Sequence, residues 1–167
     1  PELEGILSQL QKRISYLKVF GYEENQGLGF ALNFGLMERT YVALVKTQGP
    51  LTRDDHKHGA HAAQALGKMA EARARLQLAN QFGEDAEIMD WLWDIDSNYG
   101  RVFLAGDLET IELRCLKMPF NPIQAKAVQY AVRQVTETGV FEGLLPQGEY
   151  EIVTPLRSPP SQMVHVM

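Results

Sequence analysis

The sequence contains one cysteine, Cys115, among its 167 residues. A single cysteine excludes an intramolecular disulfide and is typical of proteins from a reducing compartment. Its apolar neighbours favour a buried structural thiol, because a nucleophilic cysteine needs an activating base or cation close by. The sequence therefore predicts neither a disulfide framework nor a cysteine-dependent enzyme.

Long apolar runs are also missing. The longest mostly apolar stretch, residues 28–37, is interrupted by Asn33 and followed by Glu38 and Arg39. It is shorter than the roughly 20 apolar residues that a membrane-spanning helix needs. The first residues are acidic and lack the basic start and apolar centre of a signal peptide. We therefore expect a cytoplasmic protein with no membrane partner.

Motifs for bound ions and nucleotides are incomplete. Residues 27–29 (Gly-Leu-Gly) lack the third glycine and the preceding strand of a phosphate-binding loop. Residues 94–98 have the Asp-x-Asp-x-Asn opening of a calcium loop. However, Tyr99 and Ala105 occupy the places where that loop needs glycine and glutamate. We therefore expect no cofactor.

Basic residues are scarce in the second half of the chain. Residues 1–83 carry a net charge of +2 and residues 84–167 a net charge of −7. Nine acidic residues lie in residues 84–112, with Arg101 as the only basic one. An acidic surface repels the phosphates of nucleic acids and suits a basic protein partner. A merely solvated face explains the same charges.

Helical periodicity dominates what is present. Apolar residues recur at helical spacing in five segments: 2–18, 30–45, 54–82, 84–96 and 122–138. We expect Gly21 to end the first helix. Thr52 and Asp55 resemble a capping box at the start of the third helix, and Asn121 with the following proline is a strong helix start. Gly139 fits the end of the last helix.

The remaining segments are less regular. We expect a loop at residues 96–100, a turn at 144–148 and a short strand at 149–153. Residues 101–118 fit either a hairpin on a Gly106-Asp107 turn or a helix capped by Asp107. We favour the helix, because the apolar spacing fits its period.

These elements predict a mainly α protein. The expected fold is an irregular bundle of about five helices with a short C-terminal strand or extended tail. Residues 1–153 would form a single helical domain. Residues 154–167, which contain three prolines, would form an extended C-terminal tail.

Three of the four histidines lie within residues 56–61. On a helix, Asp54, His58 and His61 fall within about 60° of one another, and three ligands on one face are enough for an open zinc-type site. Glu38 is a possible further ligand. The same face continues into an alanine-rich stripe typical of a buried surface. We therefore favour histidines that are hydrogen-bonded at a helix–helix contact.

Two strips of side chains suit nucleic acid, since they combine residue types that bond phosphates and base edges. One strip consists of Lys126, Gln129 and Arg133, and the other of Lys57, Lys68 and Arg75. A helix-turn-helix would require a second helix soon after Gly139, where the sequence predicts a turn.

Protein–protein contact is the leading hypothesis. Trp93 falls between the two faces of its helix and is a candidate interface anchor, and the acidic face beside it consists of Glu87, Asp90 and Asp94. We expect a non-enzymatic, bacterial adaptor or regulatory protein that binds a protein partner or itself as an oligomer. The alternative is a dimeric DNA-binding transcriptional regulator, and the third hypothesis is a helical-bundle metalloprotein that uses the Asp/His cluster.

Overall fold

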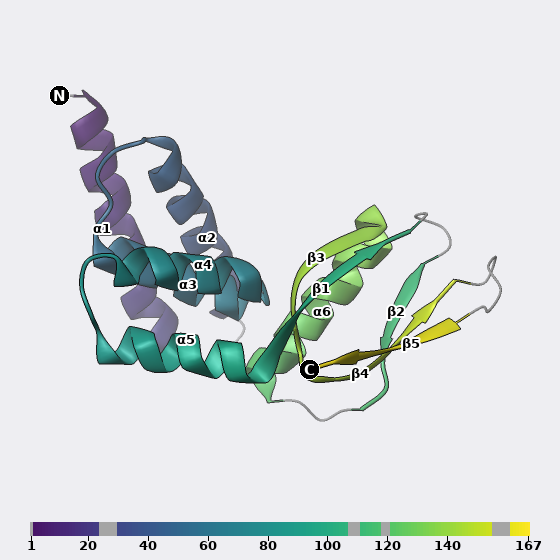
Figure 1. Ribbon diagram of the computed structural model, residues 1–167. Coiled ribbons are helices and arrows are strands. Elements are labelled where there is room, and N and C mark those ends of the chain that lie inside the picture. Colours follow the sequence, from purple (N-terminus) through teal and green to yellow (C-terminus); the bar gives the residue numbers. More distant parts are fainter. Residues whose placement is uncertain (1, 24–29, 107–110, 118–120, 155–160) are drawn as a thin grey trace. The chain divides into compact units, whose positions relative to one another are not determined.

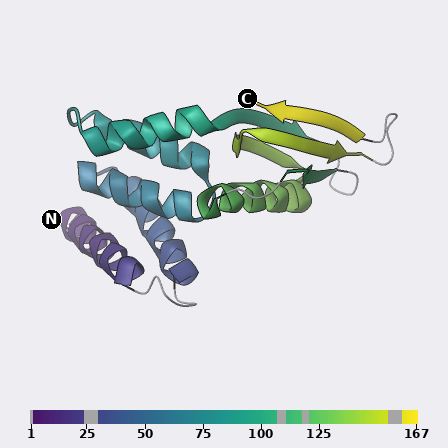
Figure 2. The same cartoon turned by 90° about the horizontal axis from the view of Figure 1, so that it is seen from below.

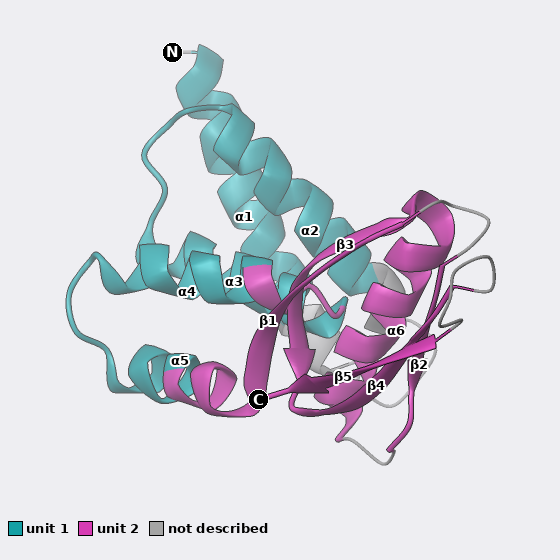
Figure 3. Cartoon of the chain, turned by 45° about the vertical axis from the view of Figure 1, so that its right-hand side comes forward, with its two compact units in different colours: residues 1–66, 71–92 teal, residues 67–70, 93–167 magenta. Residues whose placement is uncertain are grey.

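The computed structural model describes residues 2–23, 30–106, 111–117, 121–154 and 161–167. Within these ranges the chain forms six helices and five strands (Figure 1). It divides into an N-terminal unit, residues 1–66 and 71–92, and a C-terminal unit, residues 67–70 and 93–167 (Figure 3). The prediction of a mainly α bundle with one short strand is wrong, because the strands form two antiparallel sheets.

The N-terminal unit is helical. Its elements are α1 (Glu2–Glu23), α2 (Phe30–Lys46), α3 (Arg53–Ala65), most of α4 (Met69–Asn80) and the start of α5 (Ala86–Asn98). Leu7 and Ile14 of α1 pack on Tyr41 and Leu44 of α2. The helix α1 continues past Gly21, where we expected it to end, because a helix tolerates an isolated glycine at a cost of about 1 kcal/mol.

The predicted helix 54–82 is interrupted. The capping box of Thr52 and Asp55 starts α3 as predicted, but α3 ends at Ala65 and α4 begins at Met69. Between them Gly67 has a left-handed φ of +82°, and a side chain there would collide with the carbonyl oxygen of Lys126. The break lies at a tertiary contact. The sequence alone shows two glycines in this alanine-rich run, Gly59 and Gly67, and does not indicate which of them ends a helix.

The helix α5 leads directly into strand β1 (Tyr99–Ala105), so the predicted loop at residues 96–100 is wrong. The last carbonyl groups of α5 accept hydrogen bonds from Gln147. Its backbone N–H donates to the carbonyl of Asn98, and its side-chain amide donates to the carbonyl of Ser97, both at 2.9 Å. The last carbonyls of a helix need such partners, and a distant residue supplies them here.

The other strands are β2 (Glu112–Cys115), β3 (Val140–Pro146), β4 (Gly148–Val153) and β5 (Ser161–Val166). β1 pairs with β3 in one antiparallel sheet, and β4 lies between β2 and β5 in the other. The favoured helix at residues 101–118 is therefore wrong. The alternative hairpin is not formed either, because β1 and β2 pair with different strands. Asp107 itself lies outside the described residues.

The end of the chain is more ordered into strands than its sequence predicts. The turn expected at residues 144–148 is confined to Gln147, because β3 continues through Pro146. The predicted strand at 149–153 is confirmed as part of β4. Within the predicted extended tail, β5 is paired with β4, whereas the proline segment 155–160 lies outside the described residues.

Helix α6 (Pro122–Thr138) has the predicted ends, with a capping box at Asn121 and a left-handed Gly139. It lies along the strands of the C-terminal unit (Figure 2). Its apolar side packs against both sheets and forms the core of this unit. That core includes Leu104, Leu113, Val128, Ala131, Val135, Phe141, Leu145, Tyr150 and Val166.

Candidate functional site

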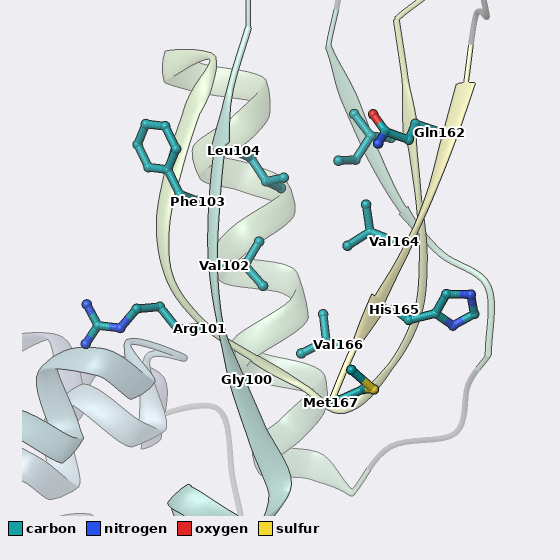
Figure 4. A pocket seen from close by; sticks show the side chains of 11 residues that line it. Gly100, Arg101, Val102, Phe103, Leu104, Gln162, Val164, His165, Val166 and Met167 are labelled. Carbon is teal, nitrogen blue, oxygen red and sulfur yellow. The ribbon is translucent and has the colours of Figure 1, made fainter.

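Strands β1 and β5 are edge strands of the two sheets in the C-terminal unit, as are β3 and β2. Each pairs with a neighbour on one side only, and within the described ranges no backbone hydrogen bond joins β1 to β5. A cleft of about 530 Å³ lies between them (Figure 4). This volume is within the usual range for ligand sites. We call it the β1–β5 cleft.

The β1–β5 cleft is closed at one end. Gly100 of β1 lies so close to β5 that a Cβ atom there would be 2.6 Å from Cγ1 of Val166. From this point the two strands run in opposite directions and diverge toward Leu104 and Gln162 (Figure 4). The same Cβ atom would lie 2.8 Å from the backbone oxygen of Met167, so this position requires glycine.

The side chains that point into the interior of the cleft are apolar, whereas polar atoms make up the larger part of its accessible lining. The side chains of Val102 and Leu104 from β1 and of Val164 and Val166 from β5 point into it (Figure 4). Val102 and Val164 are only partly buried and pack against the core beneath α6. An apolar occupant would cover this surface, at a gain of about 25 cal/mol for each Å² removed from water.

The outer sides of the two strands carry the polar and aromatic groups. Arg101 and Phe103 project from β1 and His165 from β5 (Figure 4). The side chain of Phe103 is strongly exposed, at 67 %. Among the described residues that line the cleft none is Asp or Glu, and Arg101 forms no ion pair with any residue that the structure describes. Arg101 is the one Lys or Arg side chain among the described residues that line the cleft.

Neither edge strand contains lysine or proline, although Arg101 places one charge on β1. Proteins often place lysine or proline on exposed edges, since proline removes a donor and lysine opposes burial. β1 reads Tyr-Gly-Arg-Val-Phe-Leu-Ala and β5 reads Ser-Gln-Met-Val-His-Val. Both edges thus offer backbone donors and acceptors beside apolar side chains.

The predicted metal residues do not gather into a site. Asp54 is exposed on α3, while the ring of His61 packs on Trp91 of α5 with centroids 4.5 Å apart. Burial, with Lys18 and His58 nearby, lowers the pKa of His61 to about 4. Among the described residues no three His, Cys, Asp or Glu side chains could hold a metal ion. The metal hypothesis therefore has no support from this geometry.

The environments of His56 and His58 are set by burial within the N-terminal unit. Burial lowers the pKa of both side chains. His56 Nδ1 lies 3.0 Å from the hydroxyl of Tyr41, whereas His58 Nδ1 is buried without a hydrogen-bond partner among the described residues.

Glu38, the possible further ligand, is buried against Arg75. Both guanidinium Nη atoms of Arg75 donate to the Glu38 carboxylate, and Nη1 also donates to the carbonyl of Gly59 at 2.8 Å. The guanidinium lies 4.2 Å from the ring centre of Tyr41. The prediction of a basic strip through Lys57 and Arg75 is therefore wrong, since Arg75 is inside and Lys57 is paired with Glu87 at 2.6 Å.

The second nucleic-acid strip is exposed. Lys126, Gln129 and Arg133 lie on the solvent side of α6. The element that follows α6 is strand β3, so the second helix of a helix-turn-helix is not found there. The strip therefore has exposed side chains without the structural context of that motif.

The predicted interface residues all lie on α5. Trp93 is 71 % exposed, and Asp90 is exposed as well. Glu87 is engaged by Lys57, and Asp94 accepts a hydrogen bond from the side chain of Asn98 at 2.9 Å. Glu87 and Asp90 belong to the N-terminal unit, whereas Trp93 and Asp94 belong to the C-terminal unit.

Cys115 lies on β2 and is partly buried. Burial raises the pKa of its thiol, which disfavours the reactive thiolate. Its Sγ donates to the carbonyl of Lys117 at 3.5 Å.

Sequence reasoning missed the residues of the β1–β5 cleft. A weak signal was present, because apolar residues alternate with exposed ones at Val102 and Leu104 and again at Val164 and Val166. Alternation indicates a strand with one buried face. It does not indicate that two such strands leave their edges free beside one another.

The chain matches no protein-family model, and no curated protein and no solved structure is significantly similar to it.

Proposed function

We propose that the chain is a non-enzymatic adaptor that binds an extended segment of a partner protein in the β1–β5 cleft. The observation that carries this proposal is a pair of strand edges, each unpaired within the described residues, that flank apolar side chains. Strand addition uses these two features, since main-chain hydrogen bonds supply affinity and alternate side chains enter the interior. The bound segment would lie between β1 and β5 and link the two sheets.

The side chains of the cleft favour binding over catalysis. General acid–base or nucleophilic chemistry needs a titratable group oriented by a second one. Apart from Arg101, the described lining contains His165 as its only titratable side chain. His165 is exposed, and its neighbour Glu149 is engaged by Lys117 at 3.0 Å. Gln162, apolar side chains and open backbone edges make up the rest.

The test is selection from a phage-displayed library in which valine alternates with randomised residues, since β-branched side chains fit a half-buried pleated surface. We expect peptides that bind the wild-type protein and lose at least tenfold in affinity for V164K, which places a charge in the cleft interior. V140K is the matched control. Val140 is exposed on β3 of the same unit, outside the cleft lining, so V140K should keep the wild-type affinity.

Backbone pairing has its own signature. Alternate peptide nitrogens of a strand between β1 and β5 face the two different edges, so N-methylation of either alternate set removes main-chain donors and should weaken binding. A library that yields no peptide sensitive to V164K would overturn the proposal. A dimer of the protein that V164K dissociates would replace the peptide by a second copy as occupant.

Trp93 is retained as a proposed second contact. A large exposed indole is typical of interface anchors, and Trp93 belongs to the same unit as the cleft.

A further inference from the structure

We infer that the segment bound in the β1–β5 cleft carries a side-chain amide, from glutamine or asparagine, at the position that faces Gln162. This inference rests on the proposed function and adds a chemical requirement for the partner. Leu104 of β1 and Gln162 of β5 line the wide end of the cleft, away from the end that Gly100 and Val166 close (Figure 4).

Gln162 is the polar member of an otherwise apolar row on β5. Alternate residues of a strand share a face, so Gln162, Val164 and Val166 lie on the same side of β5. Val166 is buried, Val164 is half-buried and Gln162 is exposed, so the row becomes more accessible toward the wide end. Figure 4 shows the side chain of Gln162 extending from β5 toward β1. An occupant of the wide end therefore meets an amide there instead of a third valine.

The amide of Gln162 is open to a hydrogen-bonding partner. Its side chain forms no hydrogen bond with any residue that the structure describes. Its cross-strand neighbour on β4 is Ile152, which has no polar side-chain atom. A carboxamide has an N–H₂ donor and a carbonyl acceptor, so a second carboxamide matches both of its groups. A carboxylate would only accept, and an apolar side chain would do neither.

A strand added beside β5 brings such a group to the right place. Directly opposed residues of adjacent strands have Cβ atoms about 5 Å apart, and their side chains meet on the same face. Stacked strands form ladders of Asn or Gln side chains in this way. The residue of the bound segment that opposes Gln162 therefore points to the same side, and its amide can both donate to Gln162 and accept from it.

The test uses one peptide selected on the wild-type protein. Each of its valines is replaced in turn by glutamine or by methionine, which has a similar length but no amide. At one of these positions we expect the wild type to bind the glutamine peptide about fivefold more tightly, as for a net gain of one hydrogen bond. Both peptides are uncharged at this position, so the preference should persist at 1 M salt.

The variant Q162M removes the amide from the cleft and should prefer the methionine peptide. Q129M is the matched control and should keep the preference for glutamine, because Gln129 is exposed on α6 of the same unit, outside the cleft lining. Peptides that are sensitive to V164K but show no preference for glutamine, or a preference that Q162M retains, would overturn this inference and leave the proposed function standing. Failure to select any peptide sensitive to V164K would overturn both.

Discussion

Charged side chains are placed differently in the two units. In the N-terminal unit Arg75 and Glu38 are buried together, with Gly59 and Tyr41 around the guanidinium. In the C-terminal unit Arg114 pairs with Glu112 on the exposed side of β2. Its core is apolar, and the backbones of β1 and β5 each have one edge that is not paired within the described residues.

The buried ion pair of the N-terminal unit and the open strand edges of the C-terminal unit have different physical consequences. A buried ion pair holds helices in one arrangement, since each charge is costly without its partner. Open strand edges contribute little to stability and can accept another chain. We therefore expect substitutions of interior charges to destabilise the N-terminal unit, whereas the proposed binding surface lies in the C-terminal unit.

The largest effect is expected from loss of the buried pair. R75M leaves the Glu38 carboxylate buried without its partner, so the free energy of unfolding should fall by about 3–5 kcal/mol. Chemical denaturation followed by circular dichroism measures this loss. The double variant E38L/R75M should recover part of the stability, because it removes both charges.

The exposed pair is the control for that experiment. R114M in the C-terminal unit should leave the denaturation midpoint unchanged, since both partners are solvated. A loss from R114M as large as that from R75M would erase the proposed contrast between the units.

The next effect concerns pH. The pKa of His61 is lowered from the ordinary 6.5 to about 4, so the unfolded chain binds more protons between these values. Stability should therefore fall as the pH drops from 6.5 to 4, by on the order of 2 kcal/mol from His61 after allowance for its partial exposure. Thermal melts of wild type and H61Q should differ in this slope, and H165Q should retain it. An equal slope in H61Q would refute the assignment.

The helix caps are a feature in which we expect the two units to behave alike. T52A in the N-terminal unit and N121A in the C-terminal unit each remove a capping box, so both should cost about 1 kcal/mol. Denaturation curves would check this equality. If the two losses differ severalfold, helix ends also contribute unequally to the two units.

The smallest effect on stability should come from Trp93. W93A should change the free energy of unfolding by less than about 0.5 kcal/mol, because the indole is exposed. Light scattering should nevertheless show whether the variant alters self-association, which would support Trp93 as an interface anchor. A large loss of stability would instead assign the indole to the packing of the unit.

Local signals in the sequence were reliable where the cause is local. The capping residues Thr52 and Asn121 mark the starts of α3 and α6 because their side chains bond backbone N–H groups three residues away. The strand at residues 149–153 was likewise predicted from its alternation.

Signals failed where the cause lies far along the chain. Gly67, at the break between α3 and α4, lies against the carbonyl oxygen of Lys126, and Gln147 bonds the last carbonyls of α5. The segment that contains β2 had the apolar spacing of a helix, but it forms a strand that pairs with the distant β4. The histidine cluster attracted attention by composition, whereas the β1–β5 cleft depends on an arrangement of strand edges that no local pattern encodes.

The pairing of β1 with β3 also bears on the order in which the protein folds. β1 follows α5 directly, but its partner strand β3 is synthesised only after the whole of α6. Contacts between residues distant in sequence form slowly, because a long chain segment must first close. The helices of residues 1–66 can associate early in synthesis. Until β3 has been synthesised, both edges of β1 remain unpaired. A chaperone that protects exposed strands would therefore have its longest opportunity at residues 99–105.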